Sequence, residues 1–314
     1  MTILVTGVAG FIGSHLGRKL LEGGQRVIGL DSFTDFYPKW IKEKNLEPLQ
    51  RNPRFEFLAQ DLNDLDGPAL LRRVEAVFHL AAQAGVRASW GRNFEAYLRN
   101  NIHNTQRLLE AAKEAGLPKF IFASSSSVYG LTPDLPMMET SPTCPLSPYG
   151  VTKLAAEQLC TLYHKNFGLP AVSLRFFTVY GPGQRPDMAF HQFLKAIAEG
   201  RDITVFGDGN QTRDFTHVAD IVDACLAALE KGRPGEVYNL GGGHRQRLAD
   251  IFPLLEEVCR KTVRRRTAEP QRGDVPDTLA GIAKAQADLG FSPRTDLRAG
   301  LAEEWAWLQA LYKT

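Results

Sequence analysis

The sequence predicts an α/β protein, with a doubly wound parallel sheet followed by a smaller C-terminal α/β domain. Three observations support this fold class. Short apolar runs alternate with segments of helical period up to residue 176, a glycine-rich turn directly follows the first run, and glycine and proline become frequent beyond residue 176. Apolar strands separated by helices are typical of a parallel sheet whose two faces are both covered.

The first domain is expected to span residues 1–176 and the second mainly residues 177–314, with segment 214–231 returning to the first. The strands of the first domain are expected at 2–6, 26–30, 55–58, 76–80, 120–123 and 171–176, and its helices near 12–23, 66–73, 94–115 and 149–167. Gly168 and Pro170 predict the end of the last of these helices, because both residues disfavour its continuation.

The bulk composition excludes several classes of protein. The chain has 314 residues, 44% of them hydrophobic and 23% charged, which is ordinary for a soluble globular enzyme. A net charge of +2 gives no argument for a nucleic-acid or membrane partner. The four cysteines and seven histidines lack metal-ligand spacing, so no metal is expected. With no signal peptide and no apolar run near the length of a membrane span, we expect a cytoplasmic protein.

A cofactor site is predicted where the first strand meets the first helix. Gly7, Gly10 and Gly13 are spaced G-x-x-G-x-x-G, which lets backbone N–H groups and a helix N-terminus approach a pyrophosphate. Asp31 follows the second strand, where a carboxylate binds the ribose hydroxyls and repels a 2′-phosphate. Because no arginine adjoins Asp31, NAD is favoured over NADP. Asp61 could face the adenine or cap a helix.

Tyr149 and Lys153 are four residues apart on a predicted helix, so they share one face of it. An ammonium held near a phenol favours the phenolate, and a tyrosinate can take the proton of an alcohol that is being oxidised. The spacing alone occurs often by chance. The glycine turn and Asp31 supply the context that turns the spacing into a catalytic hypothesis.

With these motifs and His79-Leu80-Ala81-Ala82, the whole chain resembles the extended short-chain dehydrogenase/reductase family, and more narrowly its nucleotide-sugar 4-epimerases. The resemblance implies a Rossmann domain that binds NAD, a C-terminal domain that binds a nucleoside diphosphate sugar, and a homodimer formed through helices near 94–115 and 149–167. It implies these cofactor-binding residues: Gly7, Gly10, Phe11, Ile12, Gly13, Asp31, Asp61, Leu62, Leu80, Ala81, Ala82, Asn100, Tyr149 and Lys153.

The resemblance also implies a catalytic serine that bonds the reacting hydroxyl, beside Tyr149 and Lys153. Counting back from Val128 selects Ser125 within Ser124 to Ser127, with an uncertainty of one residue. Ser126 and Ser127 are then expected to contact the substrate. Thr178 stands where the family commonly has an asparagine that contacts the sugar nucleotide, which puts a diphosphate contact there in doubt.

Several stretches are similar to UDP-glucuronate 4-epimerases, including residues 82–87, 185–189 and 271–276. The resemblance implies substrate contacts from Gln83, Arg87, Arg185, Arg213 and Arg272. Arg185 could pair bidentately with the C6 carboxylate of a uronic acid, with Arg87 as a second candidate. The alternative for Arg185 is a loop arginine that joins the two domains.

The implied reaction oxidises C4 to a ketone, turns the 4-keto sugar over and returns the hydride to its other face. UDP-glucose 4-epimerase and UDP-glucuronate decarboxylase remain alternatives. A 4,6-dehydratase would need an acid pair where Ser126 and Ser127 stand. A NAD-sensing regulatory protein would have no reason to keep Ser125, Tyr149 and Lys153 together.

Overall fold

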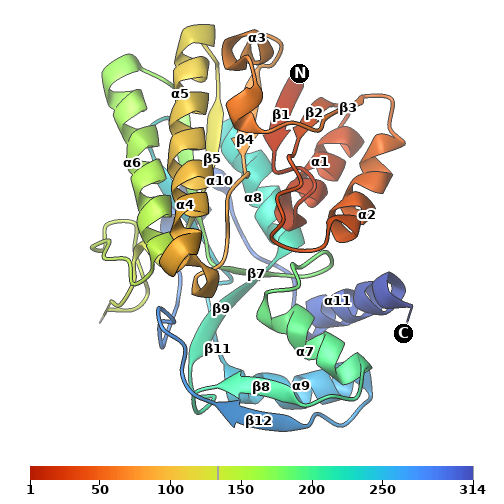
Figure 1. Ribbon diagram of the computed structural model, residues 1–314. Coiled ribbons are helices and arrows are strands. Elements are labelled where there is room, and N and C mark those ends of the chain that lie inside the picture. The colour runs from red at the N-terminus through yellow and green to blue at the C-terminus, as the bar shows by residue number, and fades with distance from the viewer. Residues whose placement is uncertain (133, 314) are drawn as a thin grey trace.

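The computed structural model describes residues 1–132 and 134–313. Its centre is a seven-stranded parallel sheet in the order β10-β6-β5-β4-β1-β2-β3 (Figure 1). The strands are β1 (Thr2–Thr6), β2 (Arg26–Leu30), β3 (Phe55–Leu58), β4 (Ala76–His79), β5 (Phe120–Ser125), β6 (Ala171–Phe176) and β10 (Val237–Leu240). The predicted Rossmann-type α/β fold is confirmed.

Helices cover both faces of this sheet, which explains why the strands are nearly continuous apolar runs. One face packs against α1 (Phe11–Glu22), α2 (Lys39–Gln50), α8 (Val218–Lys231) and α10 (Ala283–Leu289). The other face packs against α3 (Gly67–Leu71), α5 (Asn104–Ala115) and α6 (Pro148–Phe167). The central strands β4, β5 and β6 are buried along their whole length.

The smaller domain lies in the lower part of Figure 1 and has its own aromatic core, in which Phe190 and Phe215 stack at 4.5 Å between ring centroids. A three-stranded sheet has the order β11-β9-β7, and β12 pairs with β8. The elements are β7 (Thr178–Tyr180), α7 (Ala189–Ala198), β8 (Ile203–Phe206), β9 (Thr212–His217), β11 (Arg245–Arg247), α9 (Leu248–Cys259), β12 (Arg265–Ala268) and α11 (Leu297–Tyr312).

The return of the chain to the first domain starts later and extends further than segment 214–231. Residues 214–217 end β9 in the smaller domain, whereas α8 packs beside α1 and β10 extends the main sheet next to β6. Later still, α10 packs on the same face as α8. The first domain is therefore discontinuous in sequence.

Two further elements differ from the sequence-based expectation. Helix α2 was not predicted between the second and third strands. The helix expected at 94–115 consists of α4 (Phe94–Tyr97), a π-helical segment η4 (Leu98–His103) and α5. Among the residues that the structure describes, no helix is long and apolar enough to cross a membrane, and no cluster of histidine, cysteine and carboxylate side chains could hold a metal.

Candidate active site

Two cavities meet where the main sheet faces the smaller domain. One follows the glycine turn and the ends of β1, β2 and β4, and the other, of about 630 Å³, continues into the smaller domain. That volume is within the usual range for small-molecule sites. Both cavities are lined by Phe11, Ile12, Phe36, Ala84, Ser124, Tyr149, Phe176 and Arg185. Ligands in the two cavities would therefore meet beside Tyr149.

The first cavity has the donors that a dinucleotide pyrophosphate requires. Helix α1 begins after Gly10 with no side-chain cap and no acidic residue in its first turn, so its first N–H groups face the cavity unopposed. The turn is too tight for side chains, because a Cβ on Gly13 would lie 2.2 Å from the Gly7 carbonyl oxygen. The geometry therefore fits a bound pyrophosphate.

Asp31 is held in place at the end of β2. One carboxylate oxygen accepts the N–H of Ala9 at 3.1 Å, and the other accepts the N–H of Phe33 at 2.8 Å. Burial raises the pKa of Asp31, which these two hydrogen bonds and the nearby Lys42 oppose. Asp31 lines the first cavity with lone pairs left for ribose hydroxyls.

The π-helical segment η4 separates the roles of two adjacent asparagines. Asn100 lines the first cavity, whereas Asn101 is 1% exposed and bonds the backbone N–H and carbonyl of Gln83 and the hydroxyl of Thr152. Such π turns occur often at functional sites. Here the segment ties the loop after β4 to α6 and leaves Asn100 beside the cavity.

Helix α6 presents Tyr149 and Lys153 to the first cavity from its first two turns. The hydroxyl of Ser147 caps the helix by accepting the Gly150 N–H at 3.1 Å. Pro148 occupies the first helical position, where a backbone N–H would have no partner within the helix, so its missing N–H costs no hydrogen bond. Tyr149 stands edge-on to Tyr97, with 6.2 Å between ring centroids. The start of α6 thus fixes the phenol in the junction of the cavities.

The electrostatics of Tyr149 differ from a simple tyrosine–lysine pair. Burial raises the pKa of Tyr149, while a hydrogen bond with Ser125 and the charge of Arg185 lower it, and Asp187 raises it. The side chains that act on this pKa are thus those of Ser125, Arg185 and Asp187. In the protein alone the phenol is therefore protonated at neutral pH, and Ser125 and Arg185 are the groups that favour its ionisation.

Lys153 is 4% exposed, and its Nζ lies 4.4 Å from the centroid of the Phe122 ring. Burial lowers the pKa of Lys153 to about 8, against the opposing effects of Cys160 and Glu157. The ammonium form of Lys153 therefore predominates at neutral pH, but a rise in pH of about one unit is enough to deprotonate much of it.

The four consecutive serines have different surroundings. The Ser124 hydroxyl donates to Glu157 at 2.6 Å, whereas the Ser125 hydroxyl accepts the Ser127 N–H at 3.2 Å. Ser126 and Ser127 begin a short 3₁₀ turn, η5 (Ser126–Val128), and line the second cavity. Of the four, Ser125 is the one whose hydroxyl lowers the pKa of Tyr149.

Arg185 stands at the junction of the two cavities on the loop after β7, with its side chain 23% exposed. Its Nε and Nη2 donate to the two carboxylate oxygens of Asp187, each at 2.9 Å. This pairing uses one edge of the guanidinium. The other edge, with Nη1, keeps donors for a second carboxylate.

The remaining predicted substrate residues divide into two groups. Arg87, Arg213 and Thr178 line the second cavity. Arg87 pairs with Asp274 at 2.7 Å and lies over the Phe206 ring at 4.4 Å, and burial lowers the pKa of Arg213. Gln83 and Arg272 line neither cavity, and Arg272 is exposed to solvent.

The model of the NAD dependent epimerase/dehydratase family matches residues 3–241. The chain belongs to this family. One similar protein is the uncharacterized UDP-glucose epimerase YtcB of Bacillus subtilis. It is 45% identical to this chain, and the match covers 100% of this chain and 99% of that protein.

Two further members of the NAD dependent epimerase/dehydratase family match over almost the whole chain. UDP-glucuronate 4-epimerase 4 of Arabidopsis thaliana is 40% identical over 99% of this chain and 76% of that protein. The crystal structure of the Bacillus cereus UDP-glucuronic acid 4-epimerase with UDP-glucuronic acid and NAD has a TM-score of 0.97 and 47% identity, covering 99% of this chain and 100% of that one.

Sequence reasoning missed several cavity residues in this member of the family. Lys42, on the unpredicted helix α2, lines the first cavity and donates to the Thr34 carbonyl at 2.6 Å. Asp187 and Phe206 line the second cavity. The signal for Lys42 was the spacing of Ile41, Leu46 and Leu49, the buried positions of α2.

Proposed function

We propose that this protein is a NAD-dependent epimerase that inverts C4 of UDP-glucuronate to give UDP-galacturonate. The main support for this proposal is the position of Arg185. Its side chain lines both cavities, and its charge lowers the pKa of the Tyr149 phenol. A free guanidinium edge beside the reacting position suits a sugar whose C6 is a carboxylate. The relatives named for UDP-glucuronate support the same substrate.

The cofactor-binding residues proposed for NAD line the first cavity. The α1 N-terminus would hold the pyrophosphate, and Asp31 would hold the adenosine ribose hydroxyls. Further lining residues are Gly7, Gly10, Phe11, Ile12, Gly13, Asp61, Leu62, Leu80, Ala81, Ala82 and Asn100. When bound, NAD accepts a hydride from C4 of the sugar and returns it.

The chain's own residues move the proton. Tyr149 takes the proton from the O4 hydroxyl, while Ser125 holds both the phenol and that hydroxyl in line. The Lys153 ammonium lies one helical turn further along the same face and favours the negative charge that the reaction places in this region. After the 4-keto sugar has turned over about its diphosphate linkage, Tyr149 returns the proton to O4 on the other face.

Arg185 has a second task if the substrate is a uronic acid. The 4-keto intermediate is then a β-keto acid, which loses carbon dioxide most easily when the carboxylate bond is perpendicular to the ketone plane. A bidentate pair with Arg185 would hold the carboxylate near that plane and slow its loss.

We expect Arg185→Ala to weaken the apparent affinity for UDP-glucuronate roughly 10- to 100-fold, since hydrogen bonds to charged groups contribute about 1.5–3 kcal/mol. A keto-pentose by-product should appear in the proton NMR spectrum. Arg185→Lys, which keeps the charge but loses the fork, is the matched control and should recover part of the affinity. Unchanged affinity without by-product in the alanine variant would refute this role.

The substrate itself is tested by incubating the protein with UDP-glucuronate, UDP-glucose and UDP-xylose separately and identifying products by NMR. We expect UDP-galacturonate from the first and little change in the others. Xylose or a keto-pentose as the main product would indicate a decarboxylase instead.

UDP-glucose 4-epimerisation is the second candidate function. Asp187 already pairs with Arg185 and neutralises its charge, so a neutral C6 hydroxymethyl group would leave no unpaired guanidinium in the site. UDP-galactose formation at a rate similar to or above that of UDP-galacturonate would favour this candidate.

We further propose that the enzyme is a cytoplasmic homodimer. Helix α6 exposes Val151, Leu162 and Phe167 at 48%, 51% and 58%, which is unusual for large apolar side chains on one helix and suits a helix-to-helix interface. The free thiols of the four cysteines would suit a reducing compartment. Sedimentation equilibrium should give twice the mass of the chain; a monomer at micromolar concentration would contradict the dimer.

A further inference from the structure

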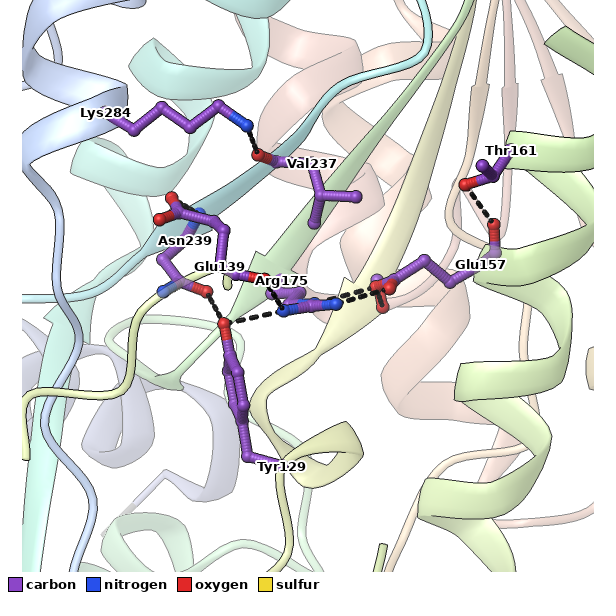
Figure 2. Close-up of polar contacts among 9 residues, drawn as sticks. Tyr129, Glu139, Glu157, Thr161, Arg175, Val237, Asn239 and Lys284 are labelled. Atoms are coloured by element: carbon purple, nitrogen blue, oxygen red, sulfur yellow. Dashed lines mark hydrogen bonds and ion pairs between the residues drawn. The ribbon is translucent and has the colours of Figure 1, made fainter. Parts of the chain in front are cut away.

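A buried ion pair lies behind the catalytic residues and has no place in the mechanism given above. Glu157 of α6 and Arg175 of β6 are 1% and 4% exposed. The Glu157 carboxylate accepts Nε of Arg175 at 2.9 Å and Nη2 at 2.6 Å, so the pair is bidentate (Figure 2). Burying two charges costs several kcal/mol each and is weak evidence for a purely stabilising role.

The pair belongs to a longer buried chain of hydrogen bonds. Nη1 of Arg175 donates to the Tyr129 hydroxyl at 2.7 Å, and that hydroxyl donates to Oδ1 of Asn239 at 2.6 Å (Figure 2). The Asn239 N–H donates to the Glu139 carboxylate at 2.9 Å. On this side the network fixes Arg175, so that its position does not depend on Glu157 alone.

On the other side the network reaches the catalytic serine strand. The Ser124 hydroxyl donates to Glu157 at 2.6 Å, and both residues are buried. Ser125 is the next residue, and successive side chains of a strand point to opposite faces. A bond that holds Ser124 against α6 therefore sets the direction in which Ser125 meets Tyr149 at the end of β5.

Glu157 also faces Lys153 from the same helix, one turn away. Two further titratable groups act on or are acted on by this lysine: His79 of β4 and Cys160 of α6. Burial lowers the pKa of His79 to about 3 and raises that of the Cys160 thiol, so both are neutral over the working pH range. Of the groups that face Lys153, Glu157 thus carries the negative charge, with Arg175 behind it.

We propose that Glu157 is a positioning residue of the catalytic site, which holds Ser124 and hence Ser125 in register with Tyr149 and supplies the negative charge opposite Lys153. Arg175 fixes the carboxylate through its two hydrogen bonds. The inference rests on the proposed roles of Tyr149, Ser125 and Lys153, but on no particular sugar.

The decisive variant is Glu157→Gln, which keeps an oxygen for Ser124 but removes the charge. Lys153 then lacks a negative charge that opposes the effect of its burial, so it should lose its proton at lower pH. We expect the alkaline limb of the kcat profile against pH to move to lower pH by about one unit. The acid limb should move less, because Tyr149 is two helical turns from the substitution. KM for the nucleotide sugar should change less than twofold.

Three further variants separate position from charge. Ser124→Ala should lower kcat several-fold with both limbs unmoved, because it removes only the hydroxyl. Glu157→Gln with Arg175→Met removes both charges, and its alkaline limb should move less than in the single variant. Thr161→Val is the matched control: the Thr161 hydroxyl donates to the Glu157 carbonyl at 3.3 Å (Figure 2), so the change touches the same turn without altering charge.

All profiles are measured on the UDP-sugar that the wild type converts fastest, so an error in the proposed substrate would leave the comparison intact. Circular dichroism and thermal unfolding establish that each variant is folded. The proposal is overturned if a folded Glu157→Gln variant keeps both limbs at the wild-type pH, or if Thr161→Val moves them equally. Should the single variant not fold, Ser124→Ala decides, and an unchanged kcat in that folded variant overturns the proposal. If neither variant folds, these residues serve folding alone and the proposal fails.

Discussion

At the residue scale, Tyr149 is held in surroundings that oppose the charge its proposed role requires. Burial raises its pKa, and the Ser125 hydrogen bond and the Arg185 guanidinium lower it. The phenol is therefore protonated at neutral pH and is available as a base only when a bound substrate and cofactor bring further charge. This arrangement would keep the site in its protonated form between turnovers.

Tyr149→Phe tests the proton-transfer role directly. The variant keeps the ring that packs edge-on against Tyr97 but has no group to exchange a proton with O4. We expect kcat to fall roughly 100- to 10,000-fold, the range of general acid–base contributions, with KM and the unfolding midpoint nearly unchanged. Product formation is followed by NMR.

Tyr163→Phe is the control, since Tyr163 lies on the same helix and its hydroxyl accepts a hydrogen bond from Gln106, outside both cavities. A Tyr149→Phe variant that retained more than about a tenth of the wild-type rate would remove Tyr149 from the acid–base role.

At the element scale, the start of α6 determines where Tyr149 stands. Only one residue separates Tyr149 from the cap Ser147, which is 5% exposed. Because the cap satisfies a backbone donor that would otherwise be buried without a partner, it fixes the first turn in which the phenol lies.

We therefore expect Ser147→Ala to lower the free energy of unfolding by about 1 kcal/mol and kcat several-fold, with no change in its pH limbs. Ser147→Asp, which keeps an acceptor at the cap, should restore most of the stability. Denaturant unfolding and steady-state kinetics measure the two effects. An alanine variant of wild-type stability would show that the cap contributes nothing.

The elements themselves were predictable where one periodicity dominated. The strands of the first domain follow apolar runs that the sheet buries on both faces, so their positions agree with the structure within a few residues. Helix α2 was missed because charged residues occupy much of it and Pro48 lies inside it. The π-helical segment η4 has no propensity signature, since it arises from the fit of Asn101 against Gln83 and Thr152.

In the candidate site, too, residues in a fixed local sequence pattern were predictable, whereas residues placed by tertiary contacts were not. Gly7, Asp31 and Tyr149 were found because each follows a strand or starts a helix in a fixed local pattern, and all line the first cavity. Arg272 was proposed from a local sequence match, but its side chain is exposed and lines neither cavity. The Arg185–Asp187 pair depends on side-chain orientation in a loop, which no periodicity encodes.

At the scale of the whole molecule, the short loop after β7 contacts helices of both domains. His15 of α1 lies 2.7 Å from the Pro182 carbonyl, and the Gly181 N–H donates to Glu304 of α11 at 2.8 Å. Arg185 follows on the same loop. The position of this arginine is therefore coupled to the cofactor-binding helix and to the C-terminal helix at once.

Glu304 makes this coupling dependent on pH. Its side chain is 0% exposed, and its second carboxylate oxygen has no hydrogen-bond partner among the described residues. Burial raises the pKa of Glu304 well above 4.5, against the opposing hydrogen bond from Gly181. A carboxyl whose pKa is raised by folding stabilises the fold while both states are protonated, and this contribution is lost as the pH rises from the unfolded pKa toward the folded one.

Glu304→Gln should remove that loss, because the amide keeps an acceptor for the Gly181 N–H and does not ionise. We expect the variant to gain stability relative to the wild type by about 1.4 kcal/mol per pH unit above about pH 5, until the folded pKa is reached. Urea unfolding at several pH values measures the difference, with Glu303→Gln, an exposed neighbour on the same helix, as the control. Parallel stability curves for the wild type and Glu304→Gln would mean that Glu304 is ionised in the fold. The loop that carries Arg185 would then be held by a buried charge rather than by a neutral acid.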